Sequence, residues 1–261
     1  MTPRAFLAIA AACTLVVAAS TADAGKRKRK LIKPASAQSS KRIKHTAKRV
    51  KPAASARSRG RAKAPSRQAN MPDGWTWPPS KEMRAAGDAC TAELDRLGVV
   101  WKPAAAEPKI ATPITVPSMV FGGVAVLPTF RKPPFVMDCQ LAHSLAVHGK
   151  ELYARGVREL HFSRIHGYTQ VRTGGQTKAA LSRHALGLAI DVRAIVDDTG
   201  HKAIVLGDYL AGDALLLRVE DYLNDSGGFR MVLTPRNDPA SHYDHFHVEA
   251  RADYTTTRPH S

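Results

Sequence analysis

Two short segments, far apart in the sequence, carry histidines and carboxylates in a pattern that limits how the chain can fold. Residues 182–191 read Ser-Arg-His-Ala-Leu-Gly-Leu-Ala-Ile-Asp, and residues 244–247 read Asp-His-Phe-His. His184, Asp191 and His247 make up the ligand set of a catalytic Zn²⁺ site, which takes three protein ligands and leaves a fourth position to water. A fold that uses this set must bring both segments to one point.

The residues around both segments alternate as half-buried strands do. Aliphatic side chains occupy positions 188, 190 and 192, so the Asp191 carboxylate projects from the opposite face. In residues 244–250, His245, His247 and Glu249 share one face. We therefore expect neighbouring strands of one sheet to carry Asp191 and His247, with His184 just before the first strand.

The other patterns predict helices mixed with strands. Helices are expected at residues 80–97, at 138–155 with Asp138 as the N-cap, and at 212–224. Strands are expected at residues 114–116, 124–127, 159–165, 188–193, 229–233 and 244–250. This arrangement predicts an α+β domain whose sheet is small, mostly antiparallel and flanked by helices.

A hydrolase built on such a site also needs a base close to the attacking water. Asp244 lies three residues before His247, at the mouth of the same strand, and is the first candidate for the general base. His245 shares the face of His247, so it could contact the oxyanion or orient the base. Arg172 is the candidate for holding the substrate carbonyl or terminal carboxylate, with Arg164 in reserve.

These residues carry a resemblance to a known superfamily. Ser-x-His-x-x-Gly-x-Ala-x-Asp followed by Asp-His-x-His resembles the zinc D-alanyl-D-alanine carboxypeptidases and peptidoglycan endopeptidases, which share their fold with the hedgehog signalling domain. Residues 90–249 resemble more closely the bacterial extensin-like C-terminal domain family, through His-Gly-Tyr-x-x-x-Arg, the His184 motif, Leu-Thr-Pro and Asp-His-Phe-His. The resemblance implies zinc ligation by His184, Asp191 and His247, a base at Asp244 and an auxiliary role for His245.

The chain departs from the family pattern at two positions. Peptidases of the superfamily usually carry arginine directly after the aromatic residue of the Gly-Tyr element, where this chain has Thr169 and places Arg172 three residues later. The extensin-like family commonly has a cysteine just before that arginine, where Val171 stands here. The resemblance thus implies that a family partner for Cys139 is missing.

The first 24 residues read as an export signal. Arg4 precedes an apolar run at residues 5–20, and Ala22-Asp23-Ala24 fits the small-x-small cleavage pattern, so residues 1–24 are assigned to a signal peptide. Export predicts a protein of the periplasm or cell envelope, with no membrane span after cleavage. Cys90 and Cys139 then remain, and they form either a disulfide or two separate buried thiols.

A basic segment separates this signal from the folded domain. Residues 25–70 contain 17 Lys and Arg and no acidic residue, whereas residues 71–261 contain 21 of each sign. Few large apolar residues occur there, so residues 25–72 are expected to be a disordered linker and residues 73–261 the domain. Behind an export signal, residues 25–70 suit an anionic envelope polymer rather than a specific nucleic acid, or serve only as a solvated linker.

The sequence therefore predicts an exported zinc peptidase that hydrolyses amide bonds in peptidoglycan stem peptides. One alternative is a non-catalytic metal-containing module that binds the cell wall. Another is a binder of anionic polymer or nucleic acid in which the basic segment is the functional part. The pattern leaves open which bond is cut, and whether the enzyme is a carboxypeptidase or an endopeptidase.

Overall fold

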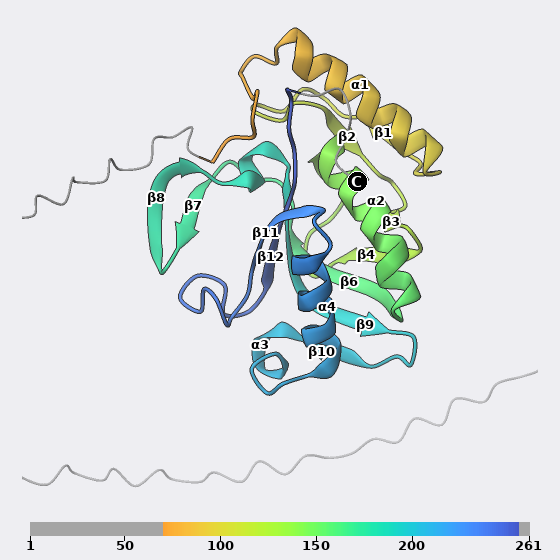
Figure 1. The fold of residues 1–261 in the computed structure, drawn as a ribbon, viewed down its shortest axis with the longest axis vertical. Coiled ribbons are helices and arrows are strands. Elements are labelled where there is room, and N and C mark those ends of the chain that lie inside the picture. The colour runs from red at the N-terminus through yellow and green to blue at the C-terminus, as the bar shows by residue number, and fades with distance from the viewer. Residues whose placement is uncertain (1–69, 256–261) are drawn as a thin grey trace, which may run out of the picture. The chain divides into compact units, whose positions relative to one another are not determined.

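The computed structural model describes residues 70–255, which form helices and several sheets (Figure 1). The predicted signal peptide and residues 25–69 of the predicted linker lie outside the described residues. The described residues begin at Asn70, three residues before the predicted domain boundary. Among the described helices, none has the length and apolar character needed to cross a membrane.

The three predicted helices are confirmed, with ends fixed by the side chains that cap them. Helix α1 spans Lys81–Arg96, α2 spans Cys139–Ala154 and α4 spans Ala214–Asp225. Their N-caps, Ser80, Asp138 and Asp213, accept hydrogen bonds from backbone N–H groups of the first turn that have no partner within the helix. A short kinked segment, α3, covers Val205–Asp208, and the 3-10 helix η1 covers Arg183–Leu186.

The strands of the described residues fall into three sheets. The largest has seven strands, in the order β11-β12-β9-β6-β4-β3 with β10 paired to β9. Its members are β3 (Val120–Phe121), β4 (Val124–Pro128), β6 (Val157–Arg164), β9 (Ala189–Asp197), β10 (Lys202–Ile204), β11 (Phe229–Leu233) and β12 (Phe246–Ala250). The smaller sheets are β1-β2-β5 (Lys102–Pro103, Pro113–Thr115, Val136–Asp138) and the hairpin β7-β8 (Gln170–Thr173, Gln176–Leu181).

This architecture confirms the α+β class, but the expectation of one small sheet is wrong, and the main sheet is not purely antiparallel. The main sheet is larger than expected, two further sheets accompany it, and β4 pairs with β6 in parallel. A parallel pair needs a long crossover connection, and here β5 and α2 lie between the two strands in the chain. The six predicted strands correspond to β2, β4, β6, β9, β11 and β12, whereas β1, β3, β5, β7, β8 and β10 were not predicted. The sequence also did not indicate which strands would become neighbours.

A buried core joins the helices to the main sheet. Helix α2 packs on α1 and on strands of that sheet, and most of its residues are buried. Cys90 on α1 and Cys139 on α2 form a disulfide, which decides between the two alternatives left open by the sequence. Burial of this extent is the main source of folding free energy. The core therefore supports one face of the strands that carry the candidate site.

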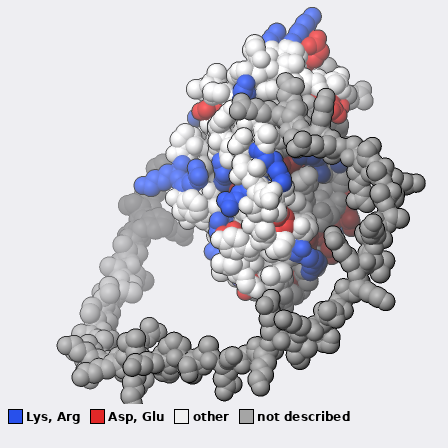
Figure 2. Space-filling model, turned by 90° about the vertical axis from the view of Figure 1, so that its left-hand side faces the viewer, with Lys and Arg blue, Asp and Glu red and all other residues white. Residues whose placement is uncertain are grey.

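Charge is nearly balanced over the part of the chain that the structure describes. Residues 70–255 contain 20 Lys and Arg and 21 Asp and Glu. On the face shown in Figure 2, basic and acidic side chains are both scattered among uncharged ones. The large positive excess of the whole chain therefore does not come from the folded domain.

Candidate metal centre

His184 is held by a short turn between β8 and β9. It belongs to η1, whose N-cap Ser182 accepts a hydrogen bond from the His184 N–H. Gly187 ends the turn with φ +67°, in the left-handed region that glycine adopts readily. A Cβ at Gly187 would lie 2.7 Å from the Asp138 backbone nitrogen, so there is no space for a larger residue. The turn therefore places the His184 ring directly beside the start of β9.

Asp191 and His247 come from adjacent strands, as the alternation predicted. Strand β12 pairs antiparallel with β9, and His247 is the direct partner of Asp191. Direct partners in an antiparallel pair place their side chains on the same face of the sheet. Both side chains therefore point away from the aliphatic core face and toward His184.

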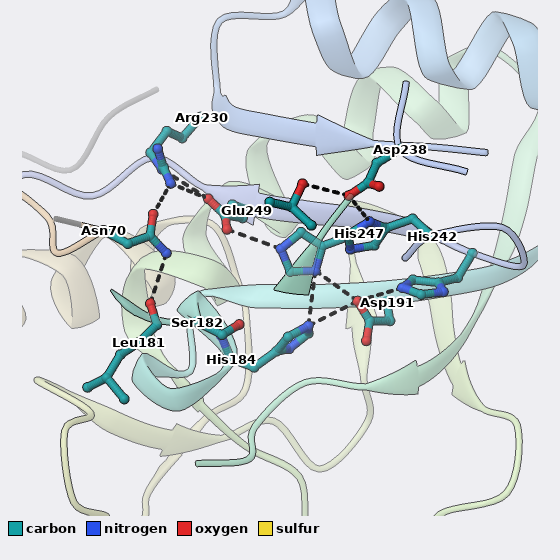
Figure 3. A network of polar contacts seen from close by, with 12 residues as sticks. Asn70, Leu181, Ser182, His184, Asp191, Arg230, Asp238, His242, His247 and Glu249 are labelled. Carbon is teal, nitrogen blue, oxygen red and sulfur yellow. Dashed lines mark hydrogen bonds and ion pairs between the residues drawn. The ribbon is translucent and has the colours of Figure 1, made fainter. Parts of the chain in front are cut away.

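The three predicted ligands converge (Figure 3). Asp191 Oδ1 lies 2.9 Å from His184 Nε2 and 2.9 Å from His247 Nδ1, and the two ring nitrogens are 3.1 Å apart. A tetrahedral ion with bonds of about 2.0–2.1 Å separates its ligand atoms by about 3.3 Å. All three residues are buried. Very small shifts would thus let one cation touch all three atoms.

Hydrogen bonds on the outer side of each imidazole turn its inner nitrogen toward the cluster. His184 Nδ1 donates to the Ile165 carbonyl at 2.7 Å, and His247 Nε2 donates to Glu249 Oε1 at 3.1 Å. Each ring can therefore present an inner lone pair, which is the tautomer that a metal ligand needs. Two imidazoles and one carboxylate are a donor set that suits Zn²⁺, so the residues fit the predicted ion.

The charges of the cluster are strongly coupled. Burial raises the pKa of Asp191, but the charge and hydrogen bond of His184 and the hydrogen bond of His247 outweigh it and hold that pKa well below its usual range. Burial lowers the pKa of His247, but hydrogen bonds to Asp191 and Glu249 outweigh it and raise that pKa to about 9. A proton on His247 Nδ1 thus competes with a cation for the same place.

Asp244 and His245 form a second polar group beside the cluster. His245 Nδ1 donates to Asp244 Oδ1 at 2.7 Å, and Arg193 Nη1 donates to Asp244 Oδ2 at 2.6 Å. Burial raises the pKa of Asp244, but His245 and Arg193 outweigh it, and the carboxyl group stays ionised. His245 Nε2 lies 3.5 Å from Asp191 Oδ1, so His245 is the member of the pair that faces the cluster.

The cluster opens into a cleft of about 420 Å³. One wall is strand β7 of the hairpin, which carries Arg172, and Arg164 and Arg230 also line the cleft. Both arginines named from the sequence, Arg172 and Arg164, therefore lie at the site, whereas Asp244 lies behind His245 and is not part of the lining. The volume is in the range of small-ligand sites.

Sequence reasoning missed residues of the site, among them His242 and Glu249. His242 lines the cleft with its ring 5.0 Å from that of His245. Its Nδ1 is held by Asp238, which also accepts hydrogen bonds from Thr173 Oγ1 and the Gly174 N–H of the hairpin. Residues 234–245 are irregular, so no periodicity pointed to this contact. The hydrogen bond from His247 to Glu249 was also missed, although the strand pattern had placed both residues on one face.

The fold and the site define a class: an α+β protein with two histidines and an aspartate gathered at the floor of a polar cleft, in a geometry fit for a divalent cation. A family model described as "Extensin-like protein C-terminus" matches residues 88–258. The chain therefore belongs to the extensin-like C-terminal family. No curated protein and no solved structure matches it.

Proposed function

We propose that this protein is an exported zinc-dependent peptidase that hydrolyses amide bonds in peptidoglycan stem peptides. The observation that carries the proposal is the convergence of His184, Asp191 and His247, each imidazole being oriented from outside by an acceptor. When bound there, Zn²⁺ would polarise a carbonyl oxygen and lower the pKa of water. The peptidase resemblance of both sequence motifs supports the choice of an amide substrate.

The residues beside the cluster supply the proton transfer and the binding of substrate. His245 Nε2 faces the cluster while Nδ1 donates to Asp244, so this pair can take a proton from the attacking water and return it to the leaving amine. In this arrangement Asp244 acts through His245 and stabilises the imidazolium. Arg172, at the cleft wall, is placed to contact a substrate carbonyl.

Location follows from the N-terminal sequence. The proposed signal peptide sends the chain to the periplasm or cell envelope, where stem peptides occur. The 17 basic residues between positions 25 and 70 would hold the domain close to anionic envelope polymer. The domain would then meet its substrate at a raised local concentration.

The test combines metal analysis with chromatography of stem-peptide fragments. The purified chain should bind one zinc ion and shorten the fragments, and a chelator should stop the reaction. His184→Ala and Asp191→Ala should lose both metal and activity, whereas the control His201→Ala should keep both, because His201 pairs with Asp213 on the surface. Activity that survives complete removal of metal would refute the proposal.

One observation favours a second candidate, a non-catalytic metal-containing module that binds the wall. Asp244, the base predicted from the sequence, does not line the cleft and has both oxygens paired, with His245 and Arg193, so it cannot take a proton directly from water in the cleft. Under this alternative the protein would bind zinc and stem peptides, and the peptides would elute unchanged after long incubation.

A further inference from the structure

We propose that Arg164 binds a carboxylate of the substrate beside the metal centre. The cleft would then select stem peptides that carry a carboxylate next to the reacting amide. The inference rests on the proposed function for the identity of the substrate, but its binding test does not require hydrolysis.

Three arginines line the cleft, and their surroundings differ. Arg230 is neutralised by Glu249, whose Oε2 accepts from Nε at 2.9 Å and from Nη2 at 2.8 Å. Arg172 is exposed on the hairpin strand β7, where water solvates its charge. Arg164 is half-buried on β6, so its charge has neither an ion-pair partner, as Arg230 has, nor full contact with water, as Arg172 has.

The sheet places Arg164 in one row with the cluster. Across β9, Asp191 pairs with His247 on one side and with Arg164 on the other. The three side chains thus stand on the same face of three adjacent strands. Arg164 and Asp191 both line the cleft, so a substrate bound beside Asp191 would also lie close to Arg164.

The hydrogen-bonding capacity of this guanidinium is largely unused. Its one hydrogen bond runs from Nη2 to the Gly167 carbonyl at 3.3 Å, and the buried Nε has no partner among the described residues. Within residues 70–255, no carboxylate lies within 4.0 Å of it. A guanidinium has five N–H donors, and partial burial of a cation without a counterion is unfavourable.

Gly167 makes room for this unpaired group. A Cβ at position 167 would lie 2.6 Å from Arg164 Nη2 and 3.1 Å from Nε. Any other residue would therefore displace the guanidinium from its place at the cleft. The backbone thus keeps open a site that the protein itself does not fill.

A carboxylate is the group that best completes the site. Its two oxygens match the donors of a guanidinium, and such a pair gives geometric specificity as well as attraction. A divalent cation carries two positive charges and Asp191 only one negative, so the cleft floor stays positive even before Arg164 is counted. Stem peptides offer carboxylates at the C-terminus and on acidic side chains, and these two sources share the same chemistry.

The experiment compares three synthetic stem peptides: one with both carboxylates free, one amidated at the C-terminus and one amidated at the side chain. Binding to the zinc-loaded full chain is measured by calorimetry, and hydrolysis by chromatography. The wild type should bind the free peptide about 10–100-fold more tightly than one of the amides, as expected for charged hydrogen bonds. Which amide binds weakly identifies the source of the carboxylate.

Substitutions test whether Arg164 is the residue that causes the preference for a free carboxylate. Arg164→Gln should bind all three peptides equally, at the affinity of the weak amide, with zinc content unchanged. The control Arg218→Gln removes the same charge from α4, away from the cleft, and should keep the preference. If Arg164→Gln fails to fold, Gly167→Ala keeps the charge but intrudes on the guanidinium, and should weaken the preference.

The outcomes separate this inference from the proposed function. Equal binding of the three peptides by the wild type, or a preference that survives in Arg164→Gln, would overturn the role of Arg164. Selective binding without hydrolysis would leave that role intact and refute the peptidase. Hydrolysis of all three peptides at equal rates would support the peptidase and refute the inference.

Discussion

Glu249 is a buried carboxylate that orients a candidate metal ligand, His247, without being a ligand itself. It is buried on β12, where it accepts from His247 Nε2 and from Arg230. Burial raises its pKa, but His247 and the arginines outweigh that effect, so Glu249 stays ionised and fixes the His247 ring. Arg230 in turn hydrogen-bonds to Asn70, which ties the first described residue to the site.

Replacing this outer carboxylate should weaken metal binding without removing a ligand. We expect Glu249→Gln to lower zinc affinity by about 10–100-fold, the usual effect of losing such a partner. Competition with a coloured chelator measures the affinity. Glu159→Gln is the matched control, because Glu159 pairs with His161 away from the cluster. An unchanged affinity in Glu249→Gln would mean that the His247 ring is fixed by its packing alone.

His242 predicts a dependence of stability on pH. Burial and the charges of His247 and His245 lower its pKa to about 4, although Asp238 acts in the opposite direction. The unfolded chain takes up this proton near pH 6.5, and the folded one only near pH 4. Stability contributed by the neutral ring is thus complete above about pH 6.5 and is lost as pH falls toward 4.

Thermal unfolding in the presence of a chelator tests whether stability falls as the pH is lowered. Between pH 7.5 and pH 4.5, the wild type should lose about 1–2 kcal/mol more than His242→Gln, after allowance for partial solvent screening, or about 3–6 °C in Tm. His201→Gln is the control of opposite sign, since the hydrogen bond to Asp213 raises the pKa of His201. Parallel Tm curves for wild type and His242→Gln would contradict the prediction.

At the scale of elements, the three longer helices and the faces of β9 and β12 could be predicted from the sequence, because both depend on local patterns. The alternation along β9 placed Asp191 opposite the aliphatic residues, and β12 did the same for His247. The order of strands could not be read, since β4 and β6 meet only through a crossover. Bulges in the pairing of β6 with β9 determine which residue of β9 lies opposite Arg164. No sequence pattern predicted these bulges.

The disulfide joins two helices, neither of which carries a candidate metal ligand. Cys90 on α1 and Cys139 at the start of α2 close a loop of 49 residues. Loop-closure entropy predicts that this crosslink stabilises the fold by about 4 kcal/mol. The candidate metal ligands lie on η1, β9 and β12, so they do not depend on the crosslink directly.

The Cys90→Ala/Cys139→Ala variant should therefore unfold about 10 °C below the wild type. Its zinc stoichiometry at 20 °C should stay unchanged. Treatment of the wild type with a reductant should reproduce the loss of Tm and leave the double variant unaffected. Loss of zinc binding in the folded double variant would show instead that α1 and α2 position the ligands.

At the scale of the whole molecule, the excess positive charge and the candidate metal site lie in different parts of the sequence. The described domain is nearly neutral in its count of charged residues, and the 17 basic residues at positions 25–70 carry the excess. Binding through many such charges releases counterions from an anionic polymer, so its strength falls steeply with salt. Binding through the cleft depends on a few contacts and should respond much less to salt.

Two forms of the protein can test this division, residues 25–261 and residues 70–261. The longer form should bind cell-wall polyanion with an affinity that falls at least about 100-fold between 50 and 200 mM salt, and the shorter form should bind weakly at either salt concentration. Both should hydrolyse a short soluble stem peptide at the same rate, because the cleft is common to both. Changing residues 26–30 to glutamine in the longer form should flatten the salt dependence in part. If the shorter form binds polyanion as tightly as the longer one, the domain rather than the basic segment holds the polymer.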